Sequence, residues 1–321
     1  MSRIEISTLI ANAKLPVALI EDLDKPDRWR RRGARWVFEE TGETPTSFTH
    51  LTPCVQCCPP KGAVLRLQMG ARTPLCDVGW SGDWNRLARR RRRAPGARVD
   101  VDHLRIEKPA TQWNLRLAAE GESPWKWKWG VASVTWRGEG KHRLWKTAPK
   151  LSRRVEIRVP RCSQMAEGGR RGSEACSAAT IQMLLAHRRV KRPLPRIMRD
   201  VLDPLENIYG NWQRSVEAAW RFGRPGLLCH FRHWEQVLAC LCAGVPIGAS
   251  IRFPRGKVHL PGAPIGHSAG HLVVLRGLAP AGQVIVNDPA AKTRSGVSRH
   301  YPLEAFSRAW LGFSGMGYLV L

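Results

Sequence analysis

The sequence predicts an α+β fold, in which a β-rich N-terminal half precedes a half that begins with helices and ends in an antiparallel sheet. Two observations carry this prediction. In the N-terminal half, apolar and polar residues alternate, which is the period of a half-buried strand. In the C-terminal half, the apolar period first lengthens to that of a helix and then gives way to short apolar runs bounded by Gly and Pro. The change of period predicts two domains, 1–150 and 151–321.

Short strands separated by turns are predicted for residues 63–136. Apolar and polar residues alternate at 65–69 and again at 113–117, and breaks that contain Gly and Pro at 94–96 and 120–124 separate such segments. This pattern favours an antiparallel, β-sandwich-like domain over a helical one. The first 45 residues show no regular pattern.

Residues 125–129 alternate tryptophan and lysine, so that on a strand the three indole rings share one face. Such a face is either a platform for sugars or nucleic-acid bases or a part of the core. Aromatic faces of strands are more often core, and we expect core packing here.

The C-terminal half shows the helical period before the strand period. Three segments have helical apolar spacing: 176–187, 212–222 and 234–243. Three short apolar runs bounded by Gly and Pro follow them: 246–253, 271–278 and 283–287. This order predicts helices packed on an antiparallel sheet.

A net charge of +26 raises the question of nucleic-acid binding, because Lys and Arg neutralise phosphates. The charge is spread over the chain: residues 1–150 hold 28 Lys and Arg against 16 Asp and Glu, and residues 151–321 hold 24 against 10. The one cluster is Arg89–Arg93, and such a run is usually a solvated loop or an interaction arm. Nucleic acid is therefore a possible partner that the distribution does not favour.

The nine cysteines are an odd number, so at least one thiol is free. Cys54 and Cys57 have the spacing of zinc ligands, but no second pair follows, and Cys76 and His50 would have to complete the site. We expect neither a metal ion nor another cofactor.

No apolar stretch reaches the roughly 18 residues that a membrane-spanning helix requires. Polar residues interrupt the N-terminal segment, which does not predict a signal peptide. The chain as given is therefore expected in the cytoplasm, and the sequence gives no indication of its oligomeric state.

The candidate nucleophile is Cys176, which stands at the start of the predicted helix 176–187. The first turn of a helix presents unpaired N–H groups and the positive end of the helix dipole. Both stabilise a thiolate and make it available for nucleophilic attack.

Three further residues complete a candidate site. His271 opens an apolar strand, from which an imidazole held by the sheet can take the thiol proton and return it to a leaving amine. Asp288 ends the next strand, where its carboxylate can orient the imidazole. Gln164 lies shortly before the nucleophile and is the candidate oxyanion donor, together with the main-chain N–H of Cys176.

The order Gln, Cys, His, Asp resembles that of papain-like cysteine peptidases, and in particular the stand-alone bacterial form of the bacteriocin-processing (double-glycine) peptidase-like family. The resemblance is carried by Gln164, Cys176–Leu185, Gly270–Leu275 and Asn287–Ala290, and it covers roughly residues 155–321. It implies a papain-like cysteine peptidase domain, a Cys-His-Asp triad, a peptide or protein substrate, a β-rich N-terminal domain and export from the cell.

The sequence departs from the family pattern next to the nucleophile. Ala175 precedes Cys176 where the relatives usually have Gly or Trp, and Ala178 stands where they have Pro. Small residues at these places keep the helix start open, so the departures bear on substrate preference.

Competing residues are poorer candidates. His267 lies in a Gly- and Pro-rich loop that would not hold an imidazole firmly, and Cys162 lies in an extended segment without a helix dipole. Asn287 could orient the histidine, but adjacent side chains of a strand face opposite ways, so only one of Asn287 and Asp288 can serve. By analogy with the family, we choose Asp288.

The leading prediction is a cysteine-type peptidase that hydrolyses peptide bonds. Acyltransferases and transglutaminase-like enzymes use the same triad with a different acceptor. A third alternative is a non-catalytic basic protein that binds nucleic acid or an acidic surface. The complete set of Gln164, Cys176, His271 and Asp288 argues against it, because a scaffold needs none of them.

Overall fold

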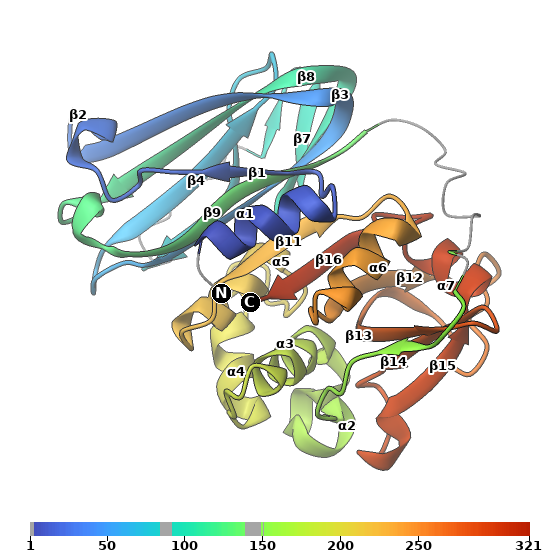
Figure 1. The fold of residues 1–321 in the computed structure, drawn as a ribbon. Helices are drawn as coiled ribbons and strands as arrows, with labels where there is room; N and C mark the ends of the chain where they lie inside the picture. Colours follow the sequence, from blue (N-terminus) through green and yellow to red (C-terminus); the bar gives the residue numbers. More distant parts are fainter. Residues whose placement is uncertain (1–2, 84–91, 139–148, 150) are drawn as a thin grey trace. The chain divides into compact units, whose positions relative to one another are not determined.

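The computed structural model describes residues 3–83, 92–138, 149 and 151–321 (Figure 1). The chain forms two compact units. Residues 17–140 and 204–206 form one, which we call the β unit, and residues 1–16, 141–203 and 207–321 form the other, which we call the α+β unit.

The β unit is built on one antiparallel sheet, which has nine strands among the described residues. Its main path runs β1-β9-β3-β8-β4-β5, and β2, β6 and β7 pair beside it. The strands are β1 (Val17–Ile20), β2 (Arg30–Arg32), β3 (Arg35–Cys58), β4 (Val64–Gly70), β5 (Cys76–Gly82), β6 (Arg93–Ala94), β7 (Ala97–Asp100), β8 (His103–Glu120) and β9 (Lys128–Arg137). The β-rich character of the N-terminal half is as predicted, and its sandwich-like arrangement stays a prediction.

The tryptophan run belongs to the core of the β unit. Trp127 is 7 % exposed, and Trp125 and Trp129 pack against the same cluster of buried residues. The run is not a single strand, because a 3-10 helix occupies Pro124–Lys126 and β9 begins at Lys128. Trp127 and Trp129 stack with ring centroids 5.9 Å apart, and Trp129 also packs against Trp29. Trp125 instead lies edge-on to Trp36.

The cysteines of the β unit are free thiols inside the sheet. Cys54 and Cys57 lie in β3 and are fully buried, as is Cys76 in β5. Within the described ranges, no group of three or more His, Cys, Asp or Glu side chains is arranged to hold a metal ion.

The α+β unit combines helices with an antiparallel sheet, which has seven strands in the described part of the chain. Its helices are α1 (Arg3–Asn12), α2 (Gln164–Glu167), α3 (Cys176–His187), α4 (Leu194–Val201), α5 (Trp212–Arg221), α6 (Trp234–Cys242) and α7 (Leu303–Ala309). Its strands are β10 (Val155–Glu156), β11 (Gly226–His230), β12 (Ile247–Phe253), β13 (Ser268–Ala279), β14 (Gln283–Asn287), β15 (Ser298–Pro302) and β16 (Met316–Val320).

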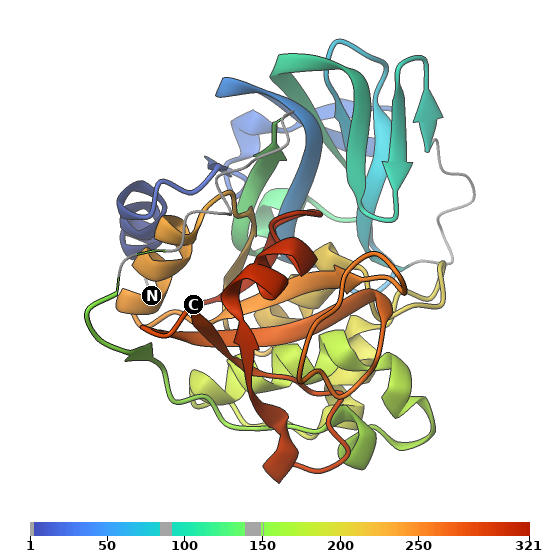
Figure 2. The same ribbon diagram turned by 90° about the vertical axis from the view of Figure 1, so that its right-hand side faces the viewer.

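The sheet of the α+β unit runs β11-β16-β12-β13-β14-β15, with β10 paired to β13 (Figure 2). Helix α3 packs on β12, β13 and β16 because its side chains from Ser177 to Leu185 are almost all buried. The predicted combination of helices with an antiparallel sheet is confirmed, and β14 has the predicted bounds. The strict order is not as predicted, because β11 precedes α6 and α7 lies between β15 and β16. Residues on α3, β13 and β14 can therefore meet at one place.

Residues 1–16 belong to the α+β unit, although they precede the β unit in the chain. Helix α1 buries Ile6 and Leu9, and the Lys14 carbonyl accepts a hydrogen bond of 2.6 Å from Gln236 of α6. The boundary predicted near Lys150 lies outside the described residues and stays a prediction.

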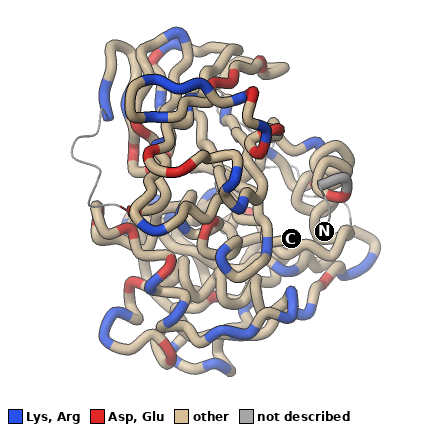
Figure 3. Tube along the Cα trace, turned by 90° about the vertical axis from the view of Figure 1, so that its left-hand side faces the viewer, with Lys and Arg blue, Asp and Glu red and all other residues tan. Residues whose placement is uncertain are grey.

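Lys and Arg are distributed over both units, as the sequence indicates (Figure 3). Residues 89–91 of the arginine run lie outside the described residues. None of the helices in the described ranges has the length and apolarity needed to cross a membrane.

Candidate active site

Cys176 is the first residue of α3, as the sequence predicts. Ala175 precedes it at the N-cap and offers no side-chain oxygen to the first turn of the helix. The N–H groups of a first turn have no partner within the helix, so they and the helix dipole favour negative charge beside this thiol.

The start of α3 is anchored by the residue that follows the cysteine. The Ser177 hydroxyl lies 2.7 Å from the Ser215 hydroxyl of α5 and 3.4 Å from the Tyr318 hydroxyl of β16. Ser215 also donates to the Asn211 carbonyl at 2.8 Å. These buried bonds fix where the helix begins and therefore where the Cys176 side chain lies.

The other cysteines of the α+β unit differ from Cys176 in exposure. Cys176 is half-buried, whereas Cys162, Cys229 and Cys240 are buried. Burial raises the pKa of the Cys240 thiol to about 12 and also raises the pKa of Cys162 and of Cys229. These three thiols are therefore neutral at physiological pH, and only Cys242 is fully exposed.

His271 lies on β13, between β12 and β14, and is 2 % exposed. Its ring is held edge-on to Phe253 of β12, with 6.4 Å between the ring centroids. Its Nε2 lies 2.8 Å from Asp288 Oδ1. Cys176 also acts on this imidazole, because its side chain contributes to raising the pKa of His271.

Asp288 directly follows β14 and is completely buried. Three donors satisfy its carboxylate. Oδ1 accepts from His271 and, at 2.9 Å, from the Ala290 N–H, and Oδ2 accepts from the Tyr301 hydroxyl at 2.6 Å. Burial alone would raise the pKa of this carboxyl, but His271 and the hydrogen-bond donors outweigh it and lower the pKa.

The charge state of His271 follows from the same contacts. Burial opposes the charged imidazolium, but the Asp288 carboxylate and the hydrogen bonds to Asp288 and Cys176 raise the pKa of His271 to about 10. The imidazole therefore retains its proton at neutral pH, beside the thiol.

Gln164 begins α2 and is 2 % exposed. Its main-chain N–H donates to the Pro289 carbonyl at 2.9 Å, one residue beyond Asp288. Its Nε2 donates to the Gly172 and Ser173 carbonyls at 2.9 and 3.1 Å.

Both carbonyls belong to the 3-10 helix Gly169–Glu174, which leads to Cys176. Gln164 therefore connects the Asp288 turn to the nucleophile, and its role as oxyanion donor stays a prediction. The Nε2 group has two hydrogens, and both are used in these hydrogen bonds. To donate to an oxyanion, Gln164 must therefore break one of the two hydrogen bonds when a carbonyl substrate binds.

Asn287 and Asp288 face opposite ways, as expected for neighbours at the end of a strand. The Asn287 side chain accepts from Arg276 at 2.9 Å and donates to the Val159 carbonyl at 3.2 Å. It therefore does not reach His271, which bonds Asp288. His267 is an exposed residue of the loop before β13.

Tyr301 is the residue of this site that sequence reasoning missed. It lies on β15, is completely buried and stacks on Phe306 with ring centroids 6.1 Å apart. The pairing of β15 with β14 brings its hydroxyl to Asp288. No local pattern marks it, because the contact depends on the register of two strands.

The family model described as "Peptidase_C39 like family" matches residues 156–318, about half of the chain. The chain belongs to this family. The α+β unit accordingly has the papain-like fold of C39-like peptidases, with helices and an antiparallel sheet. The resemblance drawn from the sequence is confirmed at the level of the family.

Two solved structures share the C39-like part of the chain. A double glycine motif protease from an AMS/PCAT transporter, in complex with the leader peptide, is 21 % identical, with 53 % of this chain and 98 % of that chain covered and a TM-score of 0.35. The peptidase domain of Streptococcus ComA, a bi-functional ABC transporter involved in a quorum sensing pathway, is 16 % identical, with 46 % and 91 % covered and a TM-score of 0.34. No curated protein matches the chain.

Proposed function

We propose that this C39-like chain is a cysteine peptidase in which Cys176 is the nucleophile, His271 the general base and acid, and Asp288 the residue that orients His271. The proposal rests on one observation: a buried imidazole bonds Asp288 at 2.8 Å, and its pKa is raised in part by a cysteine at the first position of a helix. A buried charged pair costs stability, and strongly perturbed pKa values cluster at functional sites.

The first half of the reaction forms a thioester. The Cys176 thiolate attacks the carbonyl carbon of a peptide bond, and the carbonyl oxygen becomes an oxyanion. The main-chain N–H of Cys176 and the Gln164 amide are the proposed donors to that oxyanion. His271 then gives its proton to the amine, which leaves as the C–N bond breaks.

The second half of the reaction releases the acyl group. His271, now neutral, takes a proton from a water molecule, which attacks the thioester carbon, and the carboxylic acid leaves as the Cys176 thiolate returns. Asp288 stabilises the imidazolium in both halves, because its carboxylate remains ionised beside Nε2. If an amine replaced water, the same residues would perform acyl transfer, so the products distinguish the two reactions.

The proposal is tested by the alkylation of single cysteines with iodoacetamide near pH 6, followed by mass spectrometry. Cys176 should react at least about ten times faster than Cys242, which is an ordinary exposed thiol, and far faster than the buried Cys240. In His271→Ala, Cys176 should lose this advantage. A Cys176 that reacts no faster than Cys240, or that reacts equally fast without His271, would overturn the proposal.

Turnover is tested on a mixture of unrelated peptides. The wild type should produce new amino and carboxyl termini, and Cys176→Ala should produce none. If the acyl part of the cleaved peptide were found attached to an added amine, and no free carboxylate formed, the enzyme would be an acyltransferase.

A further inference from the structure

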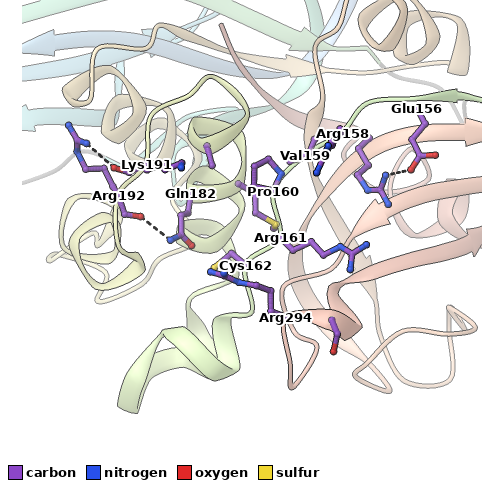
Figure 4. A pocket seen from close by; sticks show the side chains of 14 residues that line it. Glu156, Arg158, Val159, Pro160, Arg161, Cys162, Gln182, Lys191, Arg192 and Arg294 are labelled. Carbon is purple, nitrogen blue, oxygen red and sulfur yellow. Dashed lines mark hydrogen bonds and ion pairs between the residues drawn. The ribbon is translucent and has the colours of Figure 1, made fainter.

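A groove of about 1010 Å³ lies in the α+β unit and contains none of the four candidate site residues (Figure 4). It runs beside α3, where Gln182, Met183 and Ala186 line it. These residues lie six to ten positions beyond Cys176, which at about 1.5 Å per residue is roughly 9–15 Å along the helix axis. The groove is therefore separate from the proposed reacting atoms.

The base of the groove is fixed by hydrogen bonds. The buried Arg276 donates to Asn287 Oδ1 at 2.9 Å and to the Ser298 hydroxyl at 2.7 Å, and it also pairs with Glu156. Asn287 in turn holds the extended stretch before α2 by donating to the Val159 carbonyl. Part of the groove thus rests on the sheet through Arg276 and Asn287.

The lining of the groove is strongly basic. Six of its fourteen residues are Lys or Arg: Arg158, Arg161, Lys191, Arg192, Arg276 and Arg294. The single carboxylate among them, Glu156, is already paired with Arg276 and with Arg154. The positive charge therefore exceeds what the groove itself neutralises.

Three of these cations have side chains that are available to a ligand. Arg158, Arg161 and Lys191 are exposed, and their side chains make no hydrogen bond or ion pair with another residue of the described ranges. Arg192 donates to the Lys191 carbonyl at 2.8 Å, and its guanidinium lies over the Phe222 ring at 5.5 Å from the centroid. Arg294 pairs with Glu167 at 3.1 Å in an exposed ion pair, which is worth little.

The remaining lining indicates which anion fits. Val159, Pro160, Met183 and Ala186 form an apolar part between the cations, and none of the described lining residues is aromatic. A single-stranded nucleic acid needs aromatic rings on which its bases stack. A polypeptide in which carboxylates alternate with apolar side chains matches both the charged and the apolar parts, and the volume is at the upper end of ligand pockets, about 300–1,000 Å³.

We propose that this groove binds an acidic polypeptide segment, whose carboxylates pair with Arg158, Arg161, Lys191 and Arg192 and whose apolar side chains lie on Val159, Pro160 and Met183. This inference does not depend on peptide hydrolysis, because it concerns binding at a surface distant from Cys176.

Binding is measured by the fluorescence anisotropy of a labelled peptide of a dozen residues, in which Glu alternates with Leu and Ala, added to the full chain. The double variant Arg158→Glu/Arg161→Glu should weaken binding about tenfold, since each lost exposed pair is worth up to about fivefold and the new carboxylates repel the peptide. Lys191→Glu/Arg192→Glu, on a different segment, should act in the same direction. The same peptide with Gln in place of Glu should not bind.

The matched control is Arg255→Glu/Lys257→Glu, which changes the net charge equally at two exposed residues outside the groove. It should alter the affinity by less than about twofold, as expected for screened distant charges. An equal loss in the control and groove variants would show non-specific attraction and overturn the proposal. So would unchanged binding in both groove variants, or a labelled oligothymidylate that binds more tightly than the peptide and loses affinity in the groove variants.

Discussion

His50 in the β unit and His271 in the α+β unit both lie on central antiparallel strands, and their neighbours differ in charge. Cross-strand pairing places Arg105 and Arg137 beside His50. Burial, Arg137, His103 and Arg105 together lower the pKa of His50 to about 4. The Asp288 carboxylate and Cys176 raise that of His271 to about 10, against the effect of burial.

The comparison shows that burial alone does not determine whether a histidine is charged. His50 is neutral at physiological pH because burial and its cationic neighbours both oppose the charged imidazolium. Its Nδ1 lies 3.0 Å from the hydroxyl of Thr49. His271 is charged because a fully buried carboxylate faces it. The neighbours that strand pairing supplies therefore decide which of the two histidines is protonated at neutral pH.

The largest expected effect is that of Asp288→Asn, which removes the charge that distinguishes His271 from His50. The imidazole should lose its proton at neutral pH, and kcat for peptide hydrolysis should fall by about 10²- to 10⁴-fold. The measurement is the initial rate of hydrolysis, with alkylation of Cys176 as a second readout. The matched control is Asp77→Asn in the β unit, where the carboxylate bonds Gln68 and Arg66, and its kcat should equal that of the wild type.

Asp288→Asn should also change how the stability of the folded chain depends on pH. The pKa of His271 is raised above its ordinary value of about 6.5. Protonated His271 therefore stabilises the folded state fully below about pH 6.5, and this contribution is lost as the pH rises through about 10. The lowered pKa of Asp288 adds stability that is lost only when the pH falls through that lowered value. The Tm difference between wild type and Asp288→Asn should therefore narrow from neutral pH towards pH 10. A constant difference would mean that the pair does not titrate in this range.

Gln164→Ala should lower kcat by about 10²- to 10³-fold, which is the usual effect of removing one oxyanion donor. The loss of its bonds to the Gly172 and Ser173 carbonyls should also reduce stability. Gln182→Ala is the control, because Gln182 donates only to the Arg192 carbonyl at 2.9 Å. If Gln164→Ala lowers the Tm and leaves kcat unchanged, Gln164 braces the helix start and does not contact the oxyanion.

Tyr301→Phe should have a smaller effect, since it removes one of three donors to Asp288 and keeps the ring that stacks on Phe306. A buried carboxylate that loses a donor costs about 1–3 kcal/mol, and kcat should fall about tenfold. Chemical denaturation and steady-state kinetics measure the two changes. Tyr209→Phe, a buried tyrosine of the same unit that packs under Arg171, should leave kcat at the wild-type value.

The parts of this site that could be predicted are those set by local pattern. Helical apolar spacing begins at Cys176, and α3 begins there. The alternation of faces on a strand predicted that only one of Asn287 and Asp288 can serve, and the family resemblance selected Asp288. The predicted run 283–287 coincides with β14 because a turn and a polar end bound it.

The remaining parts depend on contacts that no local pattern encodes. Tyr301 reaches Asp288 only through the pairing of β15 with β14. The side chain of Gln164 bonds carbonyls eight and nine residues away in a 3-10 helix that has no helical period in the sequence. Helix α4 has helical apolar spacing and buries Leu194, Ile197, Met198 and Val201. It was not predicted because Pro195 interrupts the pattern, although proline is well tolerated in the first turn of a helix.

His50→Gln should have the smallest effect on stability and activity. It tests the part of the comparison that concerns the β unit. Glutamine does not titrate and can keep a hydrogen bond to Thr49. Because the pKa of His50 is lowered to about 4, the unfolded chain binds a proton below about pH 6.5 that the folded chain does not. Wild-type stability should therefore fall between pH 6.5 and about 4 by more than that of the variant, a difference of several degrees in Tm, while kcat at neutral pH is unchanged. If the variant and the wild type lose stability in parallel on acidification, the arginines beside His50 do not control its charge, and the contrast with His271 rests on Asp288 alone.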